Sequence, residues 1–458
     1  MKKSSIVQHL KTKRHRENKQ RSQQDEAVQE EGLEDEETVE QQPPPAQKNF
    51  NRDLCKALIS SNIPLNKVNS TPFSSFLLKY TAYTVPDQST LRKYHVQDLY
   101  KETLSDLRHK VDGKKLWVSL DETTDVEQRY VACFVFGILG EEVERLKCYL
   151  GNVAELKSVN HSTIAAFFND SLHVLWPQQI LYENVLIATT DAAPYMCKAM
   201  RGLQVMYPKM IHVTCLAHGL HRVAEMVRSN YPEVNRLISA AKSVFLKSPR
   251  RVEKFKELSP GVSLPPSPVV TRWGTWLEAA QYYSNHLEEV NKTIMSFDET
   301  EAQSIAECRE LLNNVEVKVS LAFIANQFSV LASTIEKLET RGLSLKTAVG
   351  YITEVKEKLE NMYDRTYFDK FTSVLAKNKG FATVKKISSL LSGKLKKTND
   401  EYINQYSSSE LTAFQFAPVV TCDVERMFSV YKTVLADNRR SFHFENLKHH
   451  LIIKCNEP

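Results

Sequence analysis

Three carboxylates stand where strand-like or helix-like runs end or begin. Asp121 closes the run LWVSLDE, Asp191 closes the run NVLIATT, and Glu425 opens the helix-like segment CDVERMFSVYKTVLAD. Ligands of α/β proteins gather beyond the carboxyl ends of strands, where carboxylate oxygens can share hard cations. Such a trio could hold two Mg²⁺ or Mn²⁺ ions about 3.5–4 Å apart and support phosphoryl transfer. The alternative is that each acid caps a strand or helix, and composition alone does not decide between the two.

The elements that would position these acids follow one another in a definite order. Three β-type runs precede a helix, a strand, a second helix and a short strand. These elements are predicted at 116–122, 130–139, 143–153, 161–176, 184–190, 192–207 and 211–215. From 216 to about 405 only helical periodicity is found, and 422–437 is the candidate for one more helix. The order predicts an α/β fold: a ribonuclease-H-like domain interrupted by an all-helical insertion, with a helical N-terminal segment.

Composition limits the class of protein. The chain has 458 residues, with 60 Lys and Arg against 55 Asp and Glu, a formal net charge of +5. Hydrophobic residues make up 42% and charged residues 25%, as in a folded globular protein. No stretch approaches the roughly 20 apolar residues that would span a bilayer, and the N-terminus does not resemble a secretory leader, so we expect no membrane partner. The eight cysteines contain no Cys-x-x-Cys pair, which suits reduced thiols in the cytosol or nucleus.

The N-terminal charges are strongly segregated. Residues 1–24 carry eight Lys and Arg against one acid, whereas residues 25–40 carry nine acids and no base. With the run QQPPPAQ that follows, this composition predicts a disordered linker over 16–48. The basic block is either a solvated tail or an arm that binds nucleic acid. His9 and His15 have the spacing of half a two-Cys two-His zinc site, but the first cysteine is Cys55, so we expect no zinc.

Five motifs resemble those of one family in both content and order. The strings LWVSLDETTD and IATTDAAPYMCKAM are similar to the two acidic motifs of the hAT (hobo–Activator–Tam) transposases. HVTCLAHGLH resembles their Cys-x-x-His element, and TRWGTW resembles their Arg-Trp element. CDVERMFSVYKTVLADNRRSFHFENLKHHLII resembles their C-terminal dimerisation segment, including its ERxFS string. Upstream, LCKALISSNIPLNKVNSTPFSSFLLKYT is similar to relatives of the CGG-triplet-repeat-binding protein, which begin with a BED-like finger.

The resemblance implies roles for individual residues. Asp121, Asp191 and Glu425 become the catalytic, metal-binding triad, with Mg²⁺ or Mn²⁺ as the cofactor if the chain is catalytically active. Cys215 and His218 become structural residues. Arg272 and Trp273 become DNA-binding residues beside the active site, where Trp273 could stack on an unpaired base, although a core tryptophan is the alternative. The chain departs from the family in three respects. Ala192 replaces the usual Asn, the finger lacks its cysteines, and the insertion is short for an active family member.

Basic side chains also cluster late in the predicted insertion. Seven lysines occupy 21 residues that contain no acid: Lys377, Lys379, Lys385, Lys386, Lys394, Lys396 and Lys397. A solvated surface is one interpretation. The uncompensated charge favours a patch that binds phosphates, and we assign DNA binding to Lys394, Lys396 and Lys397.

The C-terminal segment carries a long apolar stripe at helical spacing. The stripe runs from Val424 through Phe428 and Tyr431, and Leu447 and Leu451 continue it. One part should cover the sheet. Because the remainder exceeds what a small helix pair can bury, we expect it to meet a second subunit, with Phe428, Leu447 and Leu451 as dimerisation residues.

These observations divide the chain into six predicted segments. They are a truncated BED-like zinc-finger remnant (1–15), a disordered acidic linker (16–48), a helical DNA-binding or intertwining segment (49–112), the first part of the ribonuclease-H-like domain (113–216), the helical insertion (217–410), and the last ribonuclease-H-like helix with the dimerisation segment (411–458).

Three functions are compatible with the sequence. The first is a nuclear DNA-binding protein derived from a hAT transposase, which forms a homodimer or higher homo-oligomer on double-stranded DNA and regulates transcription. The second is an active, metal-dependent transposase that cleaves and transfers DNA strands. The third is a non-catalytic protein-interaction module. The complete set of three acids argues against the third but does not separate the first two.

Overall fold

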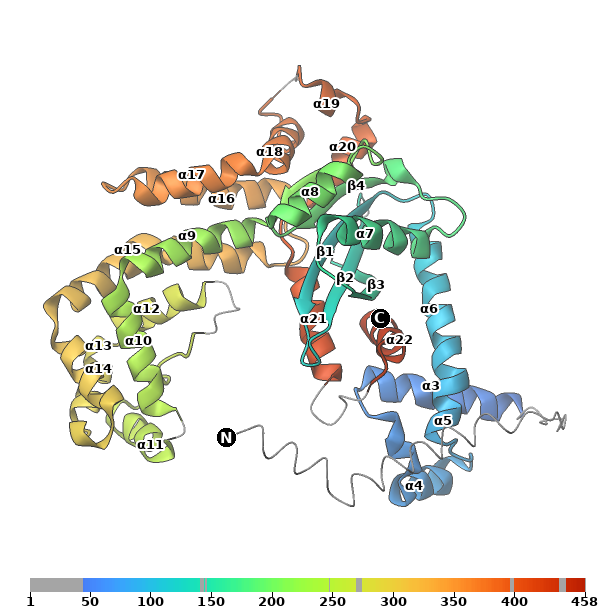
Figure 1. Cartoon of the computed structure of the whole chain (residues 1–458), viewed down its shortest axis with the longest axis horizontal. Coiled ribbons are helices and arrows are strands. Elements are labelled where there is room, and N and C mark those ends of the chain that lie inside the picture. Colours follow the sequence, from blue (N-terminus) through green and yellow to red (C-terminus); the bar gives the residue numbers. More distant parts are fainter. Residues whose placement is uncertain are drawn as a thin grey trace. The chain divides into compact units, whose positions relative to one another are not determined.

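The computed structural model describes residues 44–140, 144, 146–246, 248–268, 274–395, 399–435 and 442–457 (Figure 1). The chain divides into two compact units, Met1–Phe50 and Asn51–Pro458. The predicted finger remnant, 1–15, and most of the predicted linker lie outside the described residues. The end of the linker is helical instead, because helix α3 (Pro45–Ser60) begins at Pro45. Proline is favoured at the first helical position, and the Ala, Gln and Lys that follow are good helix formers.

The N-terminal segment of the second unit is helical, as predicted. After α3 its elements are η1 (Leu65–Asn69), α4 (Thr71–Thr81), α5 (Gln88–Thr90), the π-helical turn η2 (Leu91–His95) and α6 (Val96–Val111). Their apolar faces meet in a small core that contains Leu58, Leu91 and Leu99 and that also takes in Ile453 from the end of the chain. The segment is therefore anchored to the C-terminal helix.

A five-stranded mixed sheet confirms the α/β class. Its strands are β1 (Leu116–Thr124), β2 (Tyr130–Ile138), β3 (Tyr149–Leu156), β4 (Val185–Thr190) and β5 (Ile211–Thr214), in the order β3-β2-β1-β4-β5. β1 pairs antiparallel with β2 and parallel with β4, β2 pairs antiparallel with β3, and β4 pairs parallel with β5. The third strand was predicted to begin at 143, but β3 begins at Tyr149, which is its first residue paired with β2. The prediction began too early because the strand-like pattern of side chains extends upstream of the paired residues.

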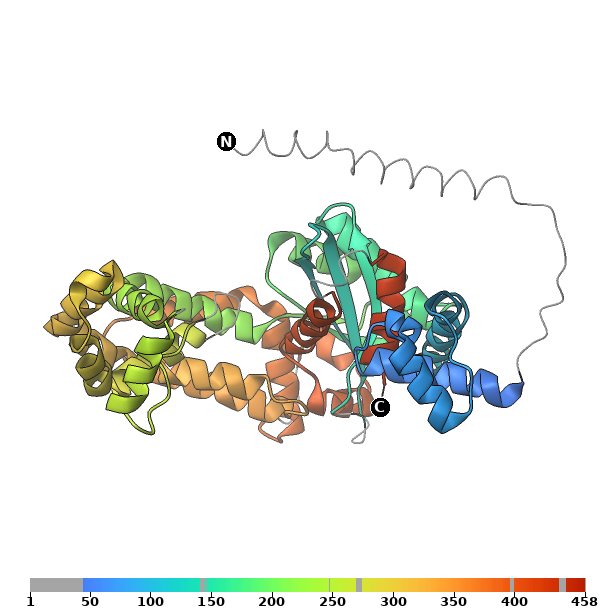
Figure 2. The same cartoon turned by 90° about the horizontal axis from the view of Figure 1, so that it is seen from below.

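Helices cover both faces of the sheet, which is why its strands are nearly continuous apolar runs. On β2, Phe134 makes an edge-to-face contact with Phe168 of α7 (His161–Leu175), at 5.8 Å between ring centroids. The adjacent residue, Cys133, faces the other way, and the charges of Cys455 and Glu425 raise the pKa of its thiol beyond the effect of burial. Helices α7 and α8 (Pro194–Leu203) therefore lie on one face, and α21 (Cys422–Val434) and α22 (Phe444–Cys455) on the other (Figures 1 and 2).

Both edges of the sheet are closed by an asparagine side chain. At the β3 edge, Asn456 accepts a hydrogen bond from Leu150 N at 3.0 Å and donates one to Leu150 O at 2.9 Å. At the β5 edge, Asn378 makes the same pair of bonds with Thr214, at 3.2 and 2.6 Å. Each carboxamide satisfies one peptide unit of an outer strand, and such unpaired units would otherwise invite pairing with another chain.

In its described part, the segment 216–413 contains helices and no strands, in agreement with the helical periodicity expected from 216 to about 405. These helices are α9 (Leu216–Asn230), α10 (Pro232–Phe245), α11 (Pro249–Leu258), α12 (Thr275–Asn285), α13 (Leu287–Met295), η5 (Glu299–Glu301), α14 (Gln303–Asn313), α15 (Val315–Leu338), α16 (Leu345–Glu360), α17 (Thr366–Lys377), α18 (Lys379–Leu391), α19 (Glu401–Asn404) and α20 (Ser408–Ala413), with η6 (Phe414–Phe416) after them. The helix α18 returns to the sheet and packs on β5.

Helix α15 corrects the expectation that no stretch of the chain is apolar enough to span a bilayer. By length and composition it is the one described helix that is apolar enough to cross a membrane. Its buried face, with Leu321, Ile324 and Phe328, packs against α9, α12 and α16. One face of α15 is thus covered within the protein, and 28% of its apolar window is buried.

The C-terminal stripe is buried within the subunit, which corrects its proposed role in dimerisation. Phe428 is 3% exposed, Leu447 0% and Leu451 1%. α21 packs on β1 and β2, while α22 packs on β3 and α6. The sequence argument failed because it did not count the N-terminal helix α6 as a partner. These three side chains are core residues, so their surfaces are already covered within the subunit.

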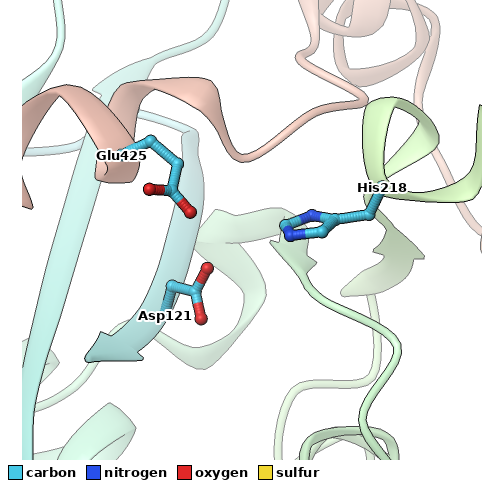
Figure 3. Close-up of side chains that lie close together, drawn as sticks. All are labelled: Asp121, His218 and Glu425. Carbon is cyan, nitrogen blue, oxygen red and sulfur yellow. The ribbon is translucent and has the colours of Figure 1, made fainter. Parts of the chain in front are cut away.

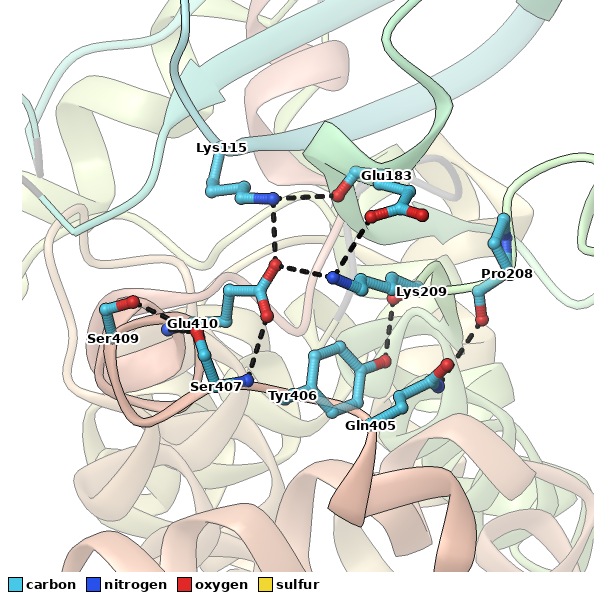
Figure 4. A network of polar contacts seen from close by, with 9 residues as sticks. All are labelled: Lys115, Glu183, Pro208, Lys209, Gln405, Tyr406, Ser407, Ser409 and Glu410. Carbon is cyan, nitrogen blue, oxygen red and sulfur yellow. Dashed lines mark hydrogen bonds and ion pairs between the residues drawn. The ribbon is translucent and has the colours of Figure 1, made fainter.

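A polar network attaches the end of the insertion to the end of the sheet at which β1, β4 and β5 begin (Figure 4). Glu410 of α20 accepts from Lys115 at 2.8 Å and from Lys209 at 3.0 Å, and its second oxygen accepts from Ser407 N at 2.9 Å. Lys209 also pairs with Glu183 at 3.2 Å. Lys115, Glu183 and Lys209 lie just before β1, β4 and β5, and Ser407 lies just before α20. The network therefore holds the starts of these four elements together, at the end of the sheet opposite Asp121 and Asp191.

We predict that Glu410→Gln lowers the free energy of unfolding at pH 7 by about 3 kcal/mol. Burial alone would raise the pKa of Glu410, but the lysines and the Ser407 N–H lower it from 4.5 to about 2, and each pKa unit is worth about 1.4 kcal/mol. A lowered pKa stabilises the fold above pH 4.5, and this contribution is lost as the pH falls through about 2. Urea denaturation should therefore show the difference between wild type and variant shrinking below pH 5. The exposed Glu401→Gln is the control, and equal effects of both substitutions would contradict the prediction.

Candidate metal centre

The two predicted aspartates belong to two neighbouring inner strands of the sheet. Ser119 of β1 is in register with Thr189 of β4, and Asp121 and Asp191 each follow two residues later. As predicted, the two acids belong to adjacent parallel strands, with Asp191 directly after β4. Asp121 does not close its strand, however, because β1 continues to Thr124, where it still forms a hairpin with β2.

Asp121 meets Glu425 and His218 beside the sheet (Figure 3). Asp121 is paired across the strands with Cys133, so it lies on the face covered by α21. Glu425 is in the first turn of α21 and His218 in the first turn of α9. One ligand atom from each of the three lies within 4.8 Å of the others. Since metal–ligand distances are about 2.0–2.3 Å, small side-chain rotations suffice for all three to bind one cation.

The electrostatics of this group favour a bound cation. Asp121 is 8% exposed. Burial raises the pKa of its carboxyl well above the usual range, and the charges of Asp191, Glu122 and Glu425 raise it further, while His218 opposes them. Burial also raises the pKa of Glu425, against the influence of His218 and Lys432. A cation would neutralise the repulsion among these groups and stabilise their ionised forms.

Asp191 lies outside the group of Asp121, His218 and Glu425, but it influences that group through its charge. Its charge raises the pKa of Asp121, and its carboxylate accepts a hydrogen bond from Ala193 N at 3.1 Å. At position 192 the family pattern has an asparagine, and its amide could orient the neighbouring carboxylate. In this chain a backbone N–H two residues after Asp191 holds the carboxylate instead, so Ala192 does not leave Asp191 without an orienting donor.

Cys215 and His218 link the two sequence-distant helices of the site. Thr421 N, just before α21, donates to Cys215 Sγ at 3.3 Å, and the Thr421 hydroxyl lies 3.5 Å from His218 Nδ1. Leu216 N donates to Val419 O at 3.0 Å. The structural role predicted for Cys215 agrees with these contacts, since its buried thiol fixes the start of α21. For His218 the structure adds a second role, as a candidate metal ligand.

Sequence reasoning also missed Glu122, the neighbour of Asp121. Strand alternation places it on the opposite face, where Tyr195 of α8 donates a hydrogen bond to its carboxylate. Burial raises the pKa of Glu122. The residue therefore supports the strand end from behind rather than joining Asp121, His218 and Glu425.

The predicted DNA-binding residues are only partly visible. Arg272, Trp273, Lys396 and Lys397 lie outside the described residues. Lys394 is exposed in the turn after α18, and Lys377, Lys379 and Lys385 are also exposed. Lys386 is not uncompensated as predicted, because it pairs with Asp400 at 2.7 Å. Asp400 lies just after the lysine-rich segment 377–397.

A cleft of about 510 Å³ opens beside Glu425. It lies between α12, α15 and α21, and its lining includes Thr275, Ile335, Glu336, Ser429 and Lys432. The insertion thus supplies one wall of a groove whose other wall is the helix that carries Glu425. Glu425 therefore belongs both to this groove and to the candidate metal centre.

Comparisons with known proteins add no assignment. A scan against protein-family models finds no match, and a search of curated proteins finds no relative of this chain.

Proposed function

We propose that this chain is a DNA-binding protein of hAT-transposase type that uses a divalent metal ion to cleave phosphodiester bonds. The observation that carries the proposal is the convergence of Asp121, His218 and Glu425 within 4.8 Å, next to Asp191. These residues come from four separate elements, β1, α9, α21 and the end of β4. Capping roles for isolated acids do not account for such a convergence.

The sheet supports a ribonuclease-H-like fold for this centre. Three strands in antiparallel succession are followed by two parallel ones, with α7 and α8 between them and α21 returning after the insertion. This is the arrangement expected for that fold, with the acids at the carboxyl ends of the two central strands. The hAT resemblance of the five motifs adds the same expectation from the sequence.

Of the two ions expected from the sequence, Mn²⁺ fits the donor set better than Mg²⁺. Two carboxylates and Asp191 nearby supply the oxygen ligands that both ions take, whereas the imidazole of His218 suits Mn²⁺ better than Mg²⁺. When bound, such an ion lowers the pKa of water and stabilises charge on phosphate oxygens. Asp121 is held by burial, Glu425 by the fixed start of α21, and Asp191 by the Ala193 N–H, so the chain keeps all three carboxylates preorganised.

Double-stranded DNA is the substrate class favoured by the exposed lysines of α17 and α18 and by the basic N-terminal block. Nuclear location and self-association belong to the same proposal and rest on the resemblance. Any dimer interface must be formed by residues other than Phe428, Leu447 and Leu451.

The proposal predicts that Glu425→Gln abolishes metal-dependent nicking of supercoiled plasmid and weakens Mn²⁺ binding at least about 100-fold. Removing a direct ligand should cost at least as much as removing an outer partner, which costs 10–100-fold. Isothermal titration calorimetry and gel assays give the two readouts. The control is Glu445→Gln, an exposed acid of α22.

The outcomes separate the candidate functions. Nicking that survives Glu425→Gln would defeat the metal centre. A wild-type protein that binds DNA and Mn²⁺ without nicking would instead support the non-catalytic DNA-binding protein.

A further inference from the structure

One face of α21 carries three polar side chains toward the cleft. Glu425, Ser429 and Lys432 are spaced at i, i+4 and i+7, which places them on the same side of the helix. All three line the cleft of about 510 Å³. A ligand that follows this face from Glu425 therefore passes Ser429 and reaches the Lys432 ammonium two turns later.

Two cationic side chains line this cleft, Arg426 and Lys432, and Arg426 is already bonded within the protein. Arg426 donates to Asp423 at 2.6 Å and to Glu339 O at 2.6 Å, both within the protein. Lys432 is exposed and makes no ion pair with any residue that the structure describes. Its charge nevertheless acts on the site, because it lowers the pKa of Glu425. Lys432 is thus a cation next to the metal centre that can pair with a ligand.

A second cation lies on the opposite side of the centre. Arg222 is one turn after His218 on α9 and is exposed. The i, i+4 spacing places Arg222 on the same side of α9 as His218. His218 and Glu425 reach the centre from opposite sides (Figure 3). Arg222 therefore stands on the His218 side of the centre, and Lys432 on the Glu425 side.

The acids themselves repel a polyanion. Asp121, Glu122, Asp191 and Glu425 act on one another electrostatically, and a phosphodiester approaching them needs compensating positive charge. We propose that Lys432 and Arg222 are phosphate-binding residues that hold one DNA strand across the metal centre, with contacts on both sides of the bond to be cleaved. This inference rests on the proposed function, and it assigns the path of the substrate at that same site.

Salt-dependent binding tests the proposal without catalysis. Lys432→Gln and Arg222→Gln would each be compared with Lys358→Gln and Arg250→Gln, which are exposed cations of α16 and α11. Binding of a labelled DNA duplex would be followed by fluorescence anisotropy in EDTA at several KCl concentrations. Removing one cation that binds a phosphate should reduce the slope of log K against log salt by about 0.9, and should weaken binding about fivefold at about 0.15 M salt. The control variants should leave the slope unchanged.

Mn²⁺ calorimetry on the same variants keeps the two proposals apart. Normal Mn²⁺ binding by Lys432→Gln and Arg222→Gln, together with reduced slopes, supports the strand path. Slopes equal to those of wild type in both variants overturn it, while the metal centre stands if Glu425→Gln still loses Mn²⁺. Reduced slopes in a protein that binds no Mn²⁺ support the phosphate contacts and refute the proposed catalysis.

Discussion

Asp121→Asn is expected to make the metal-free protein more stable, by about 1–3 kcal/mol at pH 7, while removing its stabilisation by Mn²⁺. Asp121 is 8% exposed, and burial together with Asp191, Glu122 and Glu425 raises its pKa. An ionised carboxylate in such surroundings is costly, whereas a neutral amide of the same shape avoids the charge. Since the amide is a poor ligand, the variant loses the Mn²⁺ contribution, which is about 2.7 kcal/mol at a free concentration of about 100 Kd.

The pH dependence of the metal-free protein should follow from the raised pKa. The folded state binds this proton more tightly than the unfolded state, whose Asp pKa is 3.8. The contribution of Asp121 to stability is therefore fully present below pH 3.8 and is lost as the pH rises through the folded pKa. Asp121→Asn should flatten that loss.

Urea denaturation in EDTA and in Mn²⁺ measures both effects. The exposed Asp106→Asn on α6 is the control and should leave both curves unchanged. If Asp121→Asn were less stable than wild type in EDTA, the carboxylate would be a structural group and not a strained ligand. Equal stabilisation of wild type and variant by Mn²⁺ would place the ion elsewhere.

Gly380→Ala is expected to destabilise the fold by at least about 3 kcal/mol, although alanine is normally the better helix former. A Cβ at position 380 would lie 1.8 Å from His212 O and 2.5 Å from His212 C, both backbone atoms of β5. The first turn of α18 would have to move away from the strand. That movement would also break the pair of hydrogen bonds between Asn378 and Thr214 at the sheet edge.

Gly350→Ala is the matched control for this experiment. Gly350 is also inside a helix, α16, but nothing lies within 4 Å of its Cβ position. There the substitution should stabilise the protein by about 0.5–1 kcal/mol, through the ordinary preference of helices for alanine. Urea midpoints that move in the same direction for both variants would show that α18 does not approach β5 as closely as described.

Local patterns were sufficient to predict the element types and their order. The helix predicted at 161–176 is α7 (His161–Leu175), and the strand predicted at 184–190 is β4 (Val185–Thr190). Periodicity succeeds here because each element repeats one side-chain spacing over its own length. The same reasoning placed Asp121 and Asp191 toward the same end of the sheet, because the carboxyl ends of neighbouring parallel strands lie together.

Local patterns do not show which surfaces will meet. The stripe on α21 and α22 indicated that Phe428 and Leu451 would be covered, but not by what, and we expected a second subunit. The structure covers them with the sheet and with α6, and both are distant in the chain. Periodicity records that a face is apolar, and it contains no information about its partner.

The sequence by itself determined that acids would lie on or directly after two strands and at the start of a late helix. Only the tertiary structure decided that His218 joins Asp121 and Glu425, and that two asparagines close the edges of the sheet. His218 and Glu425 are separated by nearly all of the insertion, and they come together because Cys215 and Leu216 bond to Thr421 and Val419. Contacts of that kind depend on the path of the folded chain through space, and no spacing along the sequence encodes that path.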